Sequence, residues 1–389
     1  MEKVQMNQYI GLGNSAFPKE KVRWRDVLFV FVLFEPNLFF SITILNYLYF
    51  ALIFLVFCYL VCKVGIRKCS PVLLLLVANR LCIVVPTVIY SGDIAKSIYY
   101  TVSFVSLYLL FEYYYQKDKL NVLIVSLQSV FLCYLIINLV LALMYPDGFG
   151  NLVFFLGYRT RFTDYAFALI IISALRYTID KKNNILFLCV IVSVLNLFLK
   201  WIATGLFAVG FFFALLFFGR KIVKKVKRVS FRPFYWISLV LTYLIVRFNI
   251  QEKFSWFIET VLHKNANLTF RTMLWENSIQ VIKEKIVFGH GLIENNGNFV
   301  WNGWTYTQAH NQILQSMYEC GAVGTILLFA FIYFCCNKLK LNDKRGVVLG
   351  TGVFVYLIIM IVEIYMYYMP TYSILFLAYF MSRKRSGNG

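Results

Sequence analysis

The sequence predicts an all-α protein, a polytopic bundle of transmembrane helices formed by one domain over residues 1–389. Of these residues, 60% are hydrophobic and 14% are charged, and the mean hydropathy is +0.71. Soluble domains are about 45–50% apolar and about 25% charged, so a soluble fold is excluded. Apolar runs of bilayer length recur along the chain. Because lipid offers no partners to the backbone and the alternating pattern of a barrel is absent, these runs are predicted to be helices.

Windows of bilayer length indicate about twelve spans. The first window is short and stops at Glu35-Pro36-Asn37, so it is predicted as a partial span. The segments are 25–36, 39–62, 71–90, 94–115, 120–145, 162–179, 184–200, 202–219, 233–249, 312–336, 346–364 and 366–382.

The net charge of +20 follows the predicted topology. Blocks on every second loop hold 27 of the 38 lysine and arginine residues, as the positive-inside bias of cytoplasmic loops requires. With an even number of spans, all blocks fall on one side and both tails, 1–25 and 383–389, are cytoplasmic. Because topology explains the charge, nucleic acid is not a predicted partner.

Two outer segments interrupt the regular spacing of the spans, one at 146–161 and a larger one at 250–311. Loops of the second length are usually functional or disordered, and this one is rich in tryptophan, so we expect it to fold against the outer membrane surface. Within it, Thr269 to Lys285 has the apolar spacing of an amphipathic helix. Arg271 lies in the first turn of that helix, and Gly289-His290-Gly291 ends it.

All three histidines, His263, His290 and His310, lie in the large outer loop. They lack the ligand spacing and the carboxylate or cysteine partners of a zinc site, so no metal and no cofactor is predicted. His310 opens the next span, where the positive end of a helix favours a neutral imidazole and attracts anions. It is a candidate general base toward a sugar hydroxyl, with Arg271 holding an anion close by. The alternative is an interfacial histidine that bonds only to lipid headgroups.

Three other cations, Arg159, Arg161 and Lys200, border short outer loops, where the positive-inside bias disfavours them. An anionic ligand would offset that cost, and contact with headgroup phosphates is the alternative. In the large loop, Trp304 could stack on a sugar ring, although such residues more often form the interfacial aromatic belt.

Arg80 lies inside a predicted span. We expect it to face the bundle interior, paired with Glu35 or Glu363 or as part of a site. The spacing Gly321-x-x-Gly324 is typical of close helix packing.

Short motifs in residues 270–324 resemble those of the O-antigen polymerase and ligase superfamily of membrane glycosyltransferases. That family shows an Arg-x-x-x-Trp helix, a Phe-Gly-x-Gly turn and a His-Asn pair that opens the next span. The matching residues here are Arg271 with Trp275, Gly289 with Gly291, and His310 with Asn311. The span layout and the position of the large loop are also similar.

A second motif of that family, an arginine-containing loop before the sixth span, resembles Gly157 to Phe162. The chain departs from the pattern afterwards, where Thr163-Asp164-Tyr165 stands, and this leaves open whether Arg159 or Arg161 is the equivalent. Lys200 lies in a turn that resembles the family only weakly.

The resemblance implies a metal-independent glycosyltransferase of the bacterial cytoplasmic membrane. The donor would be an oligosaccharide on a polyprenyl pyrophosphate, used at the outer face to build capsule, O-antigen or exopolysaccharide. His310 would activate the acceptor hydroxyl, and Arg271 with Arg159 or Arg161 would hold the departing pyrophosphate. Substrate contacts are expected from Lys200, Asn311 and Trp304 as well. Membrane lipid, a flippase and a chain-length regulator are the expected partners.

Other functions remain open on the sequence. A polymerase is favoured over a ligase that transfers the glycan to an envelope acceptor, because the aromatic, Asn-rich stretch Asn295 to Tyr306 could recognise a sugar acceptor. A flippase or other transporter would need charge at mid-membrane, whereas charge here collects at the outer edge. A noncatalytic scaffold or sensor would make no single loop residue essential.

Overall fold

The described part of the chain is mainly helical in the computed structural model, which confirms the predicted all-α class. The residues described are 21–65, 70–150, 153–181, 183–223, 229–248, 271–293, 299–301 and 304–383. The helices are α2 (Trp24–Leu33), α3 (Asn37–Phe40), α4 (Thr43–Val64), α5 (Pro71–Ile89), α6 (Ile94–Gln116), α7 (Leu120–Met144), α8 (Phe162–Asp180), α9 (Asn183–Leu199), α10 (Ala203–Val223), α11 (Arg232–Phe248), α13 (Arg271–Glu284), α14 (Gln312–Cys336), α15 (Lys344–Ile359) and α16 (Met369–Ser382). Two hairpins add β1 (Val153–Phe154) with β2 (Gly157–Tyr158), and β3 (Phe299–Trp301) with β4 (Trp304–Tyr306).

Each of the twelve predicted segments corresponds to one of these helices. Six helices among the described residues are long and apolar enough to cross a membrane: α4, α5, α6, α7, α14, and α8 together with the 3-10 turn η1 (Arg159–Arg161) that precedes it. α9 and the first part of α10 are apolar but shorter. The protein is therefore an all-α membrane bundle. Much of the predicted large loop, including 250–270, lies outside the described residues.

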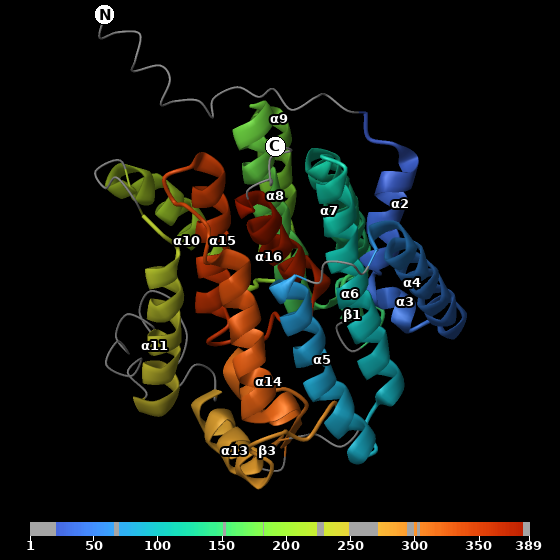
Figure 1. Cartoon of the computed structure of the whole chain (residues 1–389), viewed down its shortest axis with the longest axis vertical. Helices are drawn as coiled ribbons and strands as arrows, with labels where there is room; N and C mark the ends of the chain where they lie inside the picture. The colour runs from blue at the N-terminus through green and yellow to red at the C-terminus, as the bar shows by residue number, and fades with distance from the viewer. Residues whose placement is uncertain are drawn as a thin grey trace, which may run out of the picture.

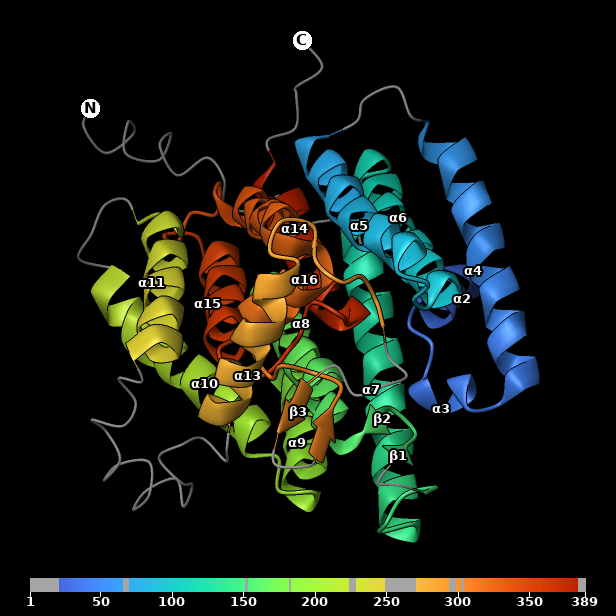
Figure 2. The same ribbon diagram turned by 90° about the horizontal axis from the view of Figure 1, so that it is seen from below.

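The helices run along the long axis of the molecule, and α13 lies with β3 at one end, beneath α14 (Figure 1). Figure 2, seen from that end, shows α13 and the β3–β4 hairpin over the middle of the bundle. α8 is the central helix, because every residue from Phe162 to Leu175 is buried. It packs against α7, α9, α10, α15 and α16. The start of α8 is thus enclosed by other helices.

The predicted amphipathic helix is confirmed as α13, and its buried face contacts the bundle. Trp275 is 1% exposed, and it packs with Leu314 and Tyr318 of α14. Ile286, just after the helix, is exposed. The helix is therefore held in place by apolar burial against α14.

α14 is broken at Gly321, where φ is 61° and ψ is −168°. The segment 286–291 fills the break, and its backbone replaces the missing helical hydrogen bonds. His290 N and Gly291 N donate to the carbonyls of Tyr318 and Glu319, and Ala322 N donates to Ile286 O. Such replacement is required, because an unpaired peptide group in lipid costs several kcal/mol. Gly324, as predicted, permits close packing: a Cβ there would lie 3.0 Å from the Cβ of Cys82 in α5.

The glycines of the Phe-Gly-His-Gly turn are needed for this docking. Gly291 has φ of +80°, and an added Cβ would lie 2.4 Å from Thr87 N. We expect Gly291→Ala to destabilise the protein by about 2 kcal/mol or more, from overpacking and the left-handed backbone together. Thermal unfolding in detergent measures the effect. The control is Gly210→Ala in α10, where a Cβ meets nothing within 4 Å; an unchanged melting temperature for Gly291→Ala would contradict the prediction.

Candidate functional site

Glu363 joins the two residues predicted to be catalytic. It lies in the connection 360–368 between α15 and α16, outside the helices. Its Oε1 accepts a hydrogen bond from Arg271 Nη2 at 2.5 Å, and its Oε2 lies 3.1 Å from His310 Nδ1. The structure therefore brings together His310 and Arg271, which are 39 positions apart, through one carboxylate.

The Glu363 side chain is enclosed, with 12% of its surface exposed, against 22% for Arg271 and 33% for His310. Burial alone would raise the pKa of Glu363. The hydrogen bond with His310 and the charges of His310 and Arg271 outweigh burial, so the pKa lies below its ordinary value of 4.5. Glu363 is thus an ionised carboxylate at neutral pH, while the imidazole beside it remains accessible.

The Ala-His-Asn-Gln motif fixes this geometry. Asn311 caps α14 by accepting from Leu314 N, and its amide donates to Ile361 O at 2.8 Å. Gln312 Oε1 accepts from the backbone N–H groups of Tyr365 and Met366. Both side chains are buried, and both hydrogen-bond to the backbone of the connection that carries Glu363. Asn311, predicted to contact substrate, is thus engaged in holding the site together.

His310 has a left-handed backbone, with φ of +47°. Non-glycine residues hold such angles at a cost of about 1–3 kcal/mol, and they cluster at functional sites. The conformation directs the chain from β4 into α14 with the imidazole beside Glu363. Among the described residues, Nε2 of His310 has no hydrogen-bond partner. A carboxylate that orients one imidazole nitrogen while the other is free is the arrangement of a general base.

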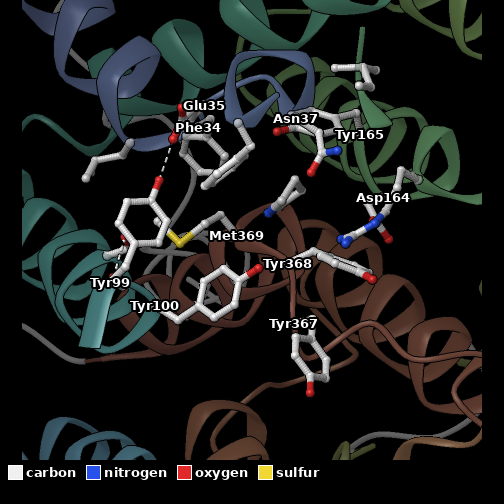
Figure 3. Close-up of a pocket in the computed structure, with 16 residues that line it drawn as sticks. Phe34, Glu35, Asn37, Tyr99, Tyr100, Asp164, Tyr165, Tyr367, Tyr368 and Met369 are labelled. Carbon is white, nitrogen blue, oxygen red and sulfur yellow. Dashed lines mark hydrogen bonds between the residues drawn. The ribbon is translucent and has the colours of Figure 1, made fainter. Parts of the chain in front are cut away.

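Arg161, in η1 at the start of α8, lines a cavity of about 70 Å³ beside this site. Its guanidinium carbon lies 3.1 Å from the ring centroid of Tyr368, in the connection that also carries Glu363. Figure 3 shows the cavity, with Glu35 and Tyr99 on one side and Asp164 on the other. Arg159 is exposed and lies over the ring of Tyr158. Of the two arginines, Arg161 is the one that the structure places at the cavity.

The remaining predicted residues lie elsewhere or have other contacts. Lys200, in the turn between α9 and α10, donates to Pro146 O. The backbone of Trp304 is in β4, opposite Trp301, but its side chain lies outside the described part of the structure.

His290 is buried, with its ring stacked on Tyr318 and bonded to Val281 O, and burial lowers its pKa. His263 lies outside the described residues.

Arg80 does not pair with Glu35 or Glu363, so these expected pairings are wrong. Its guanidinium donates to Asn79 Oδ1 and to Tyr372 Oη, and it stacks over Phe104 at 4.9 Å. Glu363 is already held by Arg271 and His310, whereas Arg80 lies where α5 meets α14 and α16. Arg80 therefore contributes to helix packing, through aromatic faces and neutral acceptors.

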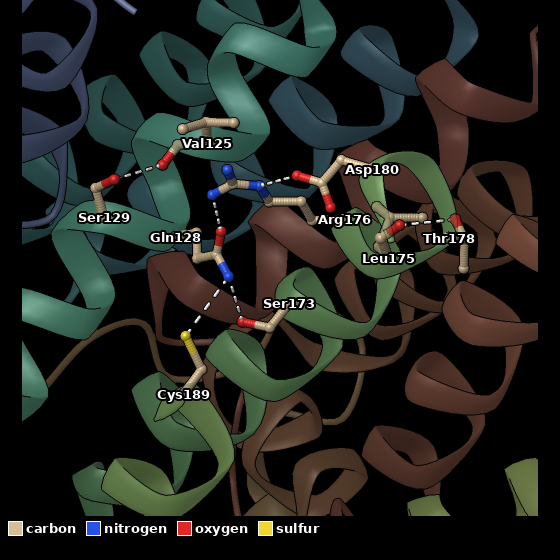
Figure 4. Close-up of polar contacts among 9 residues, drawn as sticks. All are labelled: Val125, Gln128, Ser129, Ser173, Leu175, Arg176, Thr178, Asp180 and Cys189. Carbon is tan, nitrogen blue, oxygen red and sulfur yellow. Dashed lines mark hydrogen bonds and ion pairs between the residues drawn. The ribbon is translucent and has the colours of Figure 1, made fainter. Parts of the chain in front are cut away.

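A second polar cluster lies near the other end of α8 (Figure 4). Arg176 donates to Gln128 Oε1 of α7 and to Asp180 Oδ2, and Gln128 donates to Ser173 Oγ at 2.8 Å and to Cys189 Sγ of α9. Each polar group has a partner within the cluster. The cluster therefore links α7, α8 and α9 through side-chain hydrogen bonds.

Sequence reasoning missed Glu363 as a member of the site and considered it only as a partner for Arg80. The available signal was a carboxylate in a predicted apolar span of a chain with only 18 acidic residues. No group of three or more His, Cys, Asp or Glu side chains that could hold a metal ion occurs among the described residues. Comparison of the chain with protein-family models, curated proteins and solved structures gives no match.

Proposed function

We propose that this protein is a glycosyltransferase of the bacterial cytoplasmic membrane that polymerises polyprenyl-pyrophosphate-linked saccharide units at the outer face, without a metal or other cofactor. The observation that carries the proposal is the contact of Glu363 with both His310 and Arg271. The motif resemblance to O-antigen polymerases and ligases supplies the substrate class. In this proposal the chain has twelve spans and two cytoplasmic termini, so the end that carries α13 faces outward.

The chemistry assigned to the site is a displacement at the anomeric carbon. His310 Nε2 takes the proton of the acceptor hydroxyl as its oxygen bonds to the anomeric carbon of the donor. The bond between that carbon and the pyrophosphate oxygen breaks, and the polyprenyl pyrophosphate leaves with the electron pair. Glu363 holds the imidazole by Nδ1 and balances its charge once it is protonated. A direct displacement of this kind inverts the anomeric configuration.

The arginines have separate roles in this proposal. Arg271 positions Glu363 with one N–H, and a guanidinium has four further donors for an anion. Arg161 lies at the cavity, where its charge stabilises the departing pyrophosphate. Polymerisation is preferred to ligation because the hairpin β3–β4, with its aromatic residues, lies beside α13 at this end of the bundle.

The two neighbouring arginines provide a matched pair of variants. We expect Arg161→Ala to lower the transfer rate by about 10²-fold or more, as loss of one stabilising donor in an enclosed site does. Arg159→Ala should stay within about twofold of wild type, because Arg159 is exposed. Initial rates of glycan transfer by membranes with equal amounts of each variant measure the difference. Equal losses in both variants would contradict the assignment of Arg161.

The function is tested by complementing a strain that lacks the gene with the wild-type chain, and then separating lipid-linked from finished glycan on gels. A ladder of polymer that appears only with the gene, and single lipid-linked repeats without it, is the expected result. Polymer that forms without the gene but stays on its lipid would indicate a ligase. If the strain without the gene keeps its lipid-linked repeats in the cytoplasmic leaflet of the membrane, the protein would be a flippase.

A further inference from the structure

Two buried acidic residues line the cavity beside Arg161. Glu35, in the break between α2 and α3, is 7% exposed, and Asp164, in the first turn of α8, is 2% exposed. Glu35 Oε2 accepts from Tyr99 Oη at 2.6 Å. The other oxygen, Glu35 Oε1, and Asp164 Oδ1 have no hydrogen-bond partner among the described residues. Buried polar atoms are normally paired, so unpaired oxygens on two residues that line one cavity point to a ligand that hydrogen-bonds to these carboxyl groups.

We propose that this cavity binds the hydroxyl groups of one sugar residue of the lipid-linked saccharide, an inference that rests on the proposed function. A sugar hydroxyl can donate to a carboxyl oxygen or accept from the O–H of a protonated carboxyl, so it can bond to Glu35 and Asp164 in either form. The walls between the acids are aromatic, with Tyr100 and Tyr367 edge to face at 6.3 Å between ring centroids. A few polar groups in a mainly apolar wall are what an uncharged polar ligand requires.

The positive charge of Arg161 on the same cavity argues against a metal cation as the ligand. The volume limits the size of the ligand. A water molecule occupies about 10–15 Å³ of such space, so a cavity of about 70 Å³ accepts several hydroxyl-bearing atoms but no oligosaccharide.

The position of the cavity relates it to the catalytic residues. Tyr367 and Tyr368 line it, and they belong to the same connection as Glu363. A sugar held by Glu35 and Asp164 would therefore contact the connection that carries Glu363. This cavity would determine which sugar is presented for transfer.

The test measures binding of a free saccharide, separately from transfer. The probe is the oligosaccharide released by mild acid from the lipid-linked fraction of the producing strain. Saturation-transfer NMR with the full chain in detergent compares wild type, Glu35→Gln and Asp164→Asn. The control is Asp147→Asn, which changes an exposed carboxylate outside the cavity. Tyr367→Ala changes a half-buried residue of the cavity wall. Its saccharide binding is measured as well, so that the site can be tested if an acid variant fails to fold.

We expect at least tenfold weaker binding for Glu35→Gln, Asp164→Asn and Tyr367→Ala, and wild-type binding for Asp147→Asn. Equal binding by all variants, or no binding by wild type, would overturn the sugar site. Normal transfer activity with equal binding would reject this inference and leave the proposed function standing. Selective binding without any transfer would reject the function and retain the sugar site.

Discussion

His310→Asn is expected to lower the rate of glycan transfer by about 10²–10⁴-fold, the usual contribution of a general base. Asparagine is chosen because it accepts the left-handed backbone of position 310, where φ is +47°. The loss should appear in the catalytic rate of the folded enzyme, since the imidazole is one-third exposed and contributes little packing. Polymer formed per mole of purified, folded protein measures it.

The matched control is His290→Gln, which changes the second of the two histidines among the described residues. His290 stacks on Tyr318 and bonds to Val281 O, so its loss should lower the melting temperature. The transfer rate per folded molecule should remain near that of wild type. If His310→Asn kept full activity, the assigned general base would be wrong and the transporter alternative would gain support.

Glu363→Gln is expected to impair both activity and stability. It removes the negative charge shared by Arg271 and His310, and hydrogen bonds to charged groups contribute about 1.5–3 kcal/mol each. The transfer rate should fall by about 10²-fold or more, since mutating the group that orients a catalytic base has effects of this size or larger. The same transfer assay and thermal unfolding in detergent measure the two effects.

The stability effect should depend on pH in a definite direction. The pKa of Glu363 lies below its ordinary value of 4.5 in the folded protein. Its stabilising contribution is therefore present above about pH 4.5, and it is lost as the pH falls through the lower, folded-state value. The melting temperature of wild type should approach that of Glu363→Gln in that acid range.

Glu112→Gln is the control for Glu363→Gln, because Glu112 pairs with Arg383 at 3.1 Å, at the cytoplasmic end in the proposed topology. It should lower stability without lowering the rate of transfer. A rate loss of the same size in both carboxylate variants would show that Glu363 acts only through stability.

The helices could be predicted because apolar length specifies them, but the Glu363 connection could not. The stretch around Met360, Ile361 and Tyr365 is as apolar as the helices on either side, so the sequence predicts that two spans cover it. In the structure α15 ends at Ile359, and the following residues form a buried connection. Its backbone is satisfied by Asn311 and Gln312, which lie about fifty positions earlier in the chain. An apolar run cannot by itself distinguish a buried connection from a helix.

The candidate site was predictable in part for a similar reason. His310 and Arg271 are chemically conspicuous, and the motifs around them place both at one end of the bundle. The cavity could not be predicted, because Glu35, Tyr99 and Asp164 come from three separate helical regions whose packing no spacing specifies. The choice between Arg159 and Arg161 likewise depends on which side of η1 faces the bundle.

The break in α14 has a consequence for the order of biosynthetic assembly. Gly321 lies about 14 Å along α14 from its N-terminal end, at about 1.5 Å per residue. The peptide groups around it are satisfied only when 286–291 has docked. A nascent α14 should therefore enter the bilayer as an unbroken helix, and it should adopt the break once residues 286–291 dock against it. In the proposed topology, translocation of the residues before α14 would thus precede completion of the candidate site, and a chain stalled at that stage would be inserted but inactive.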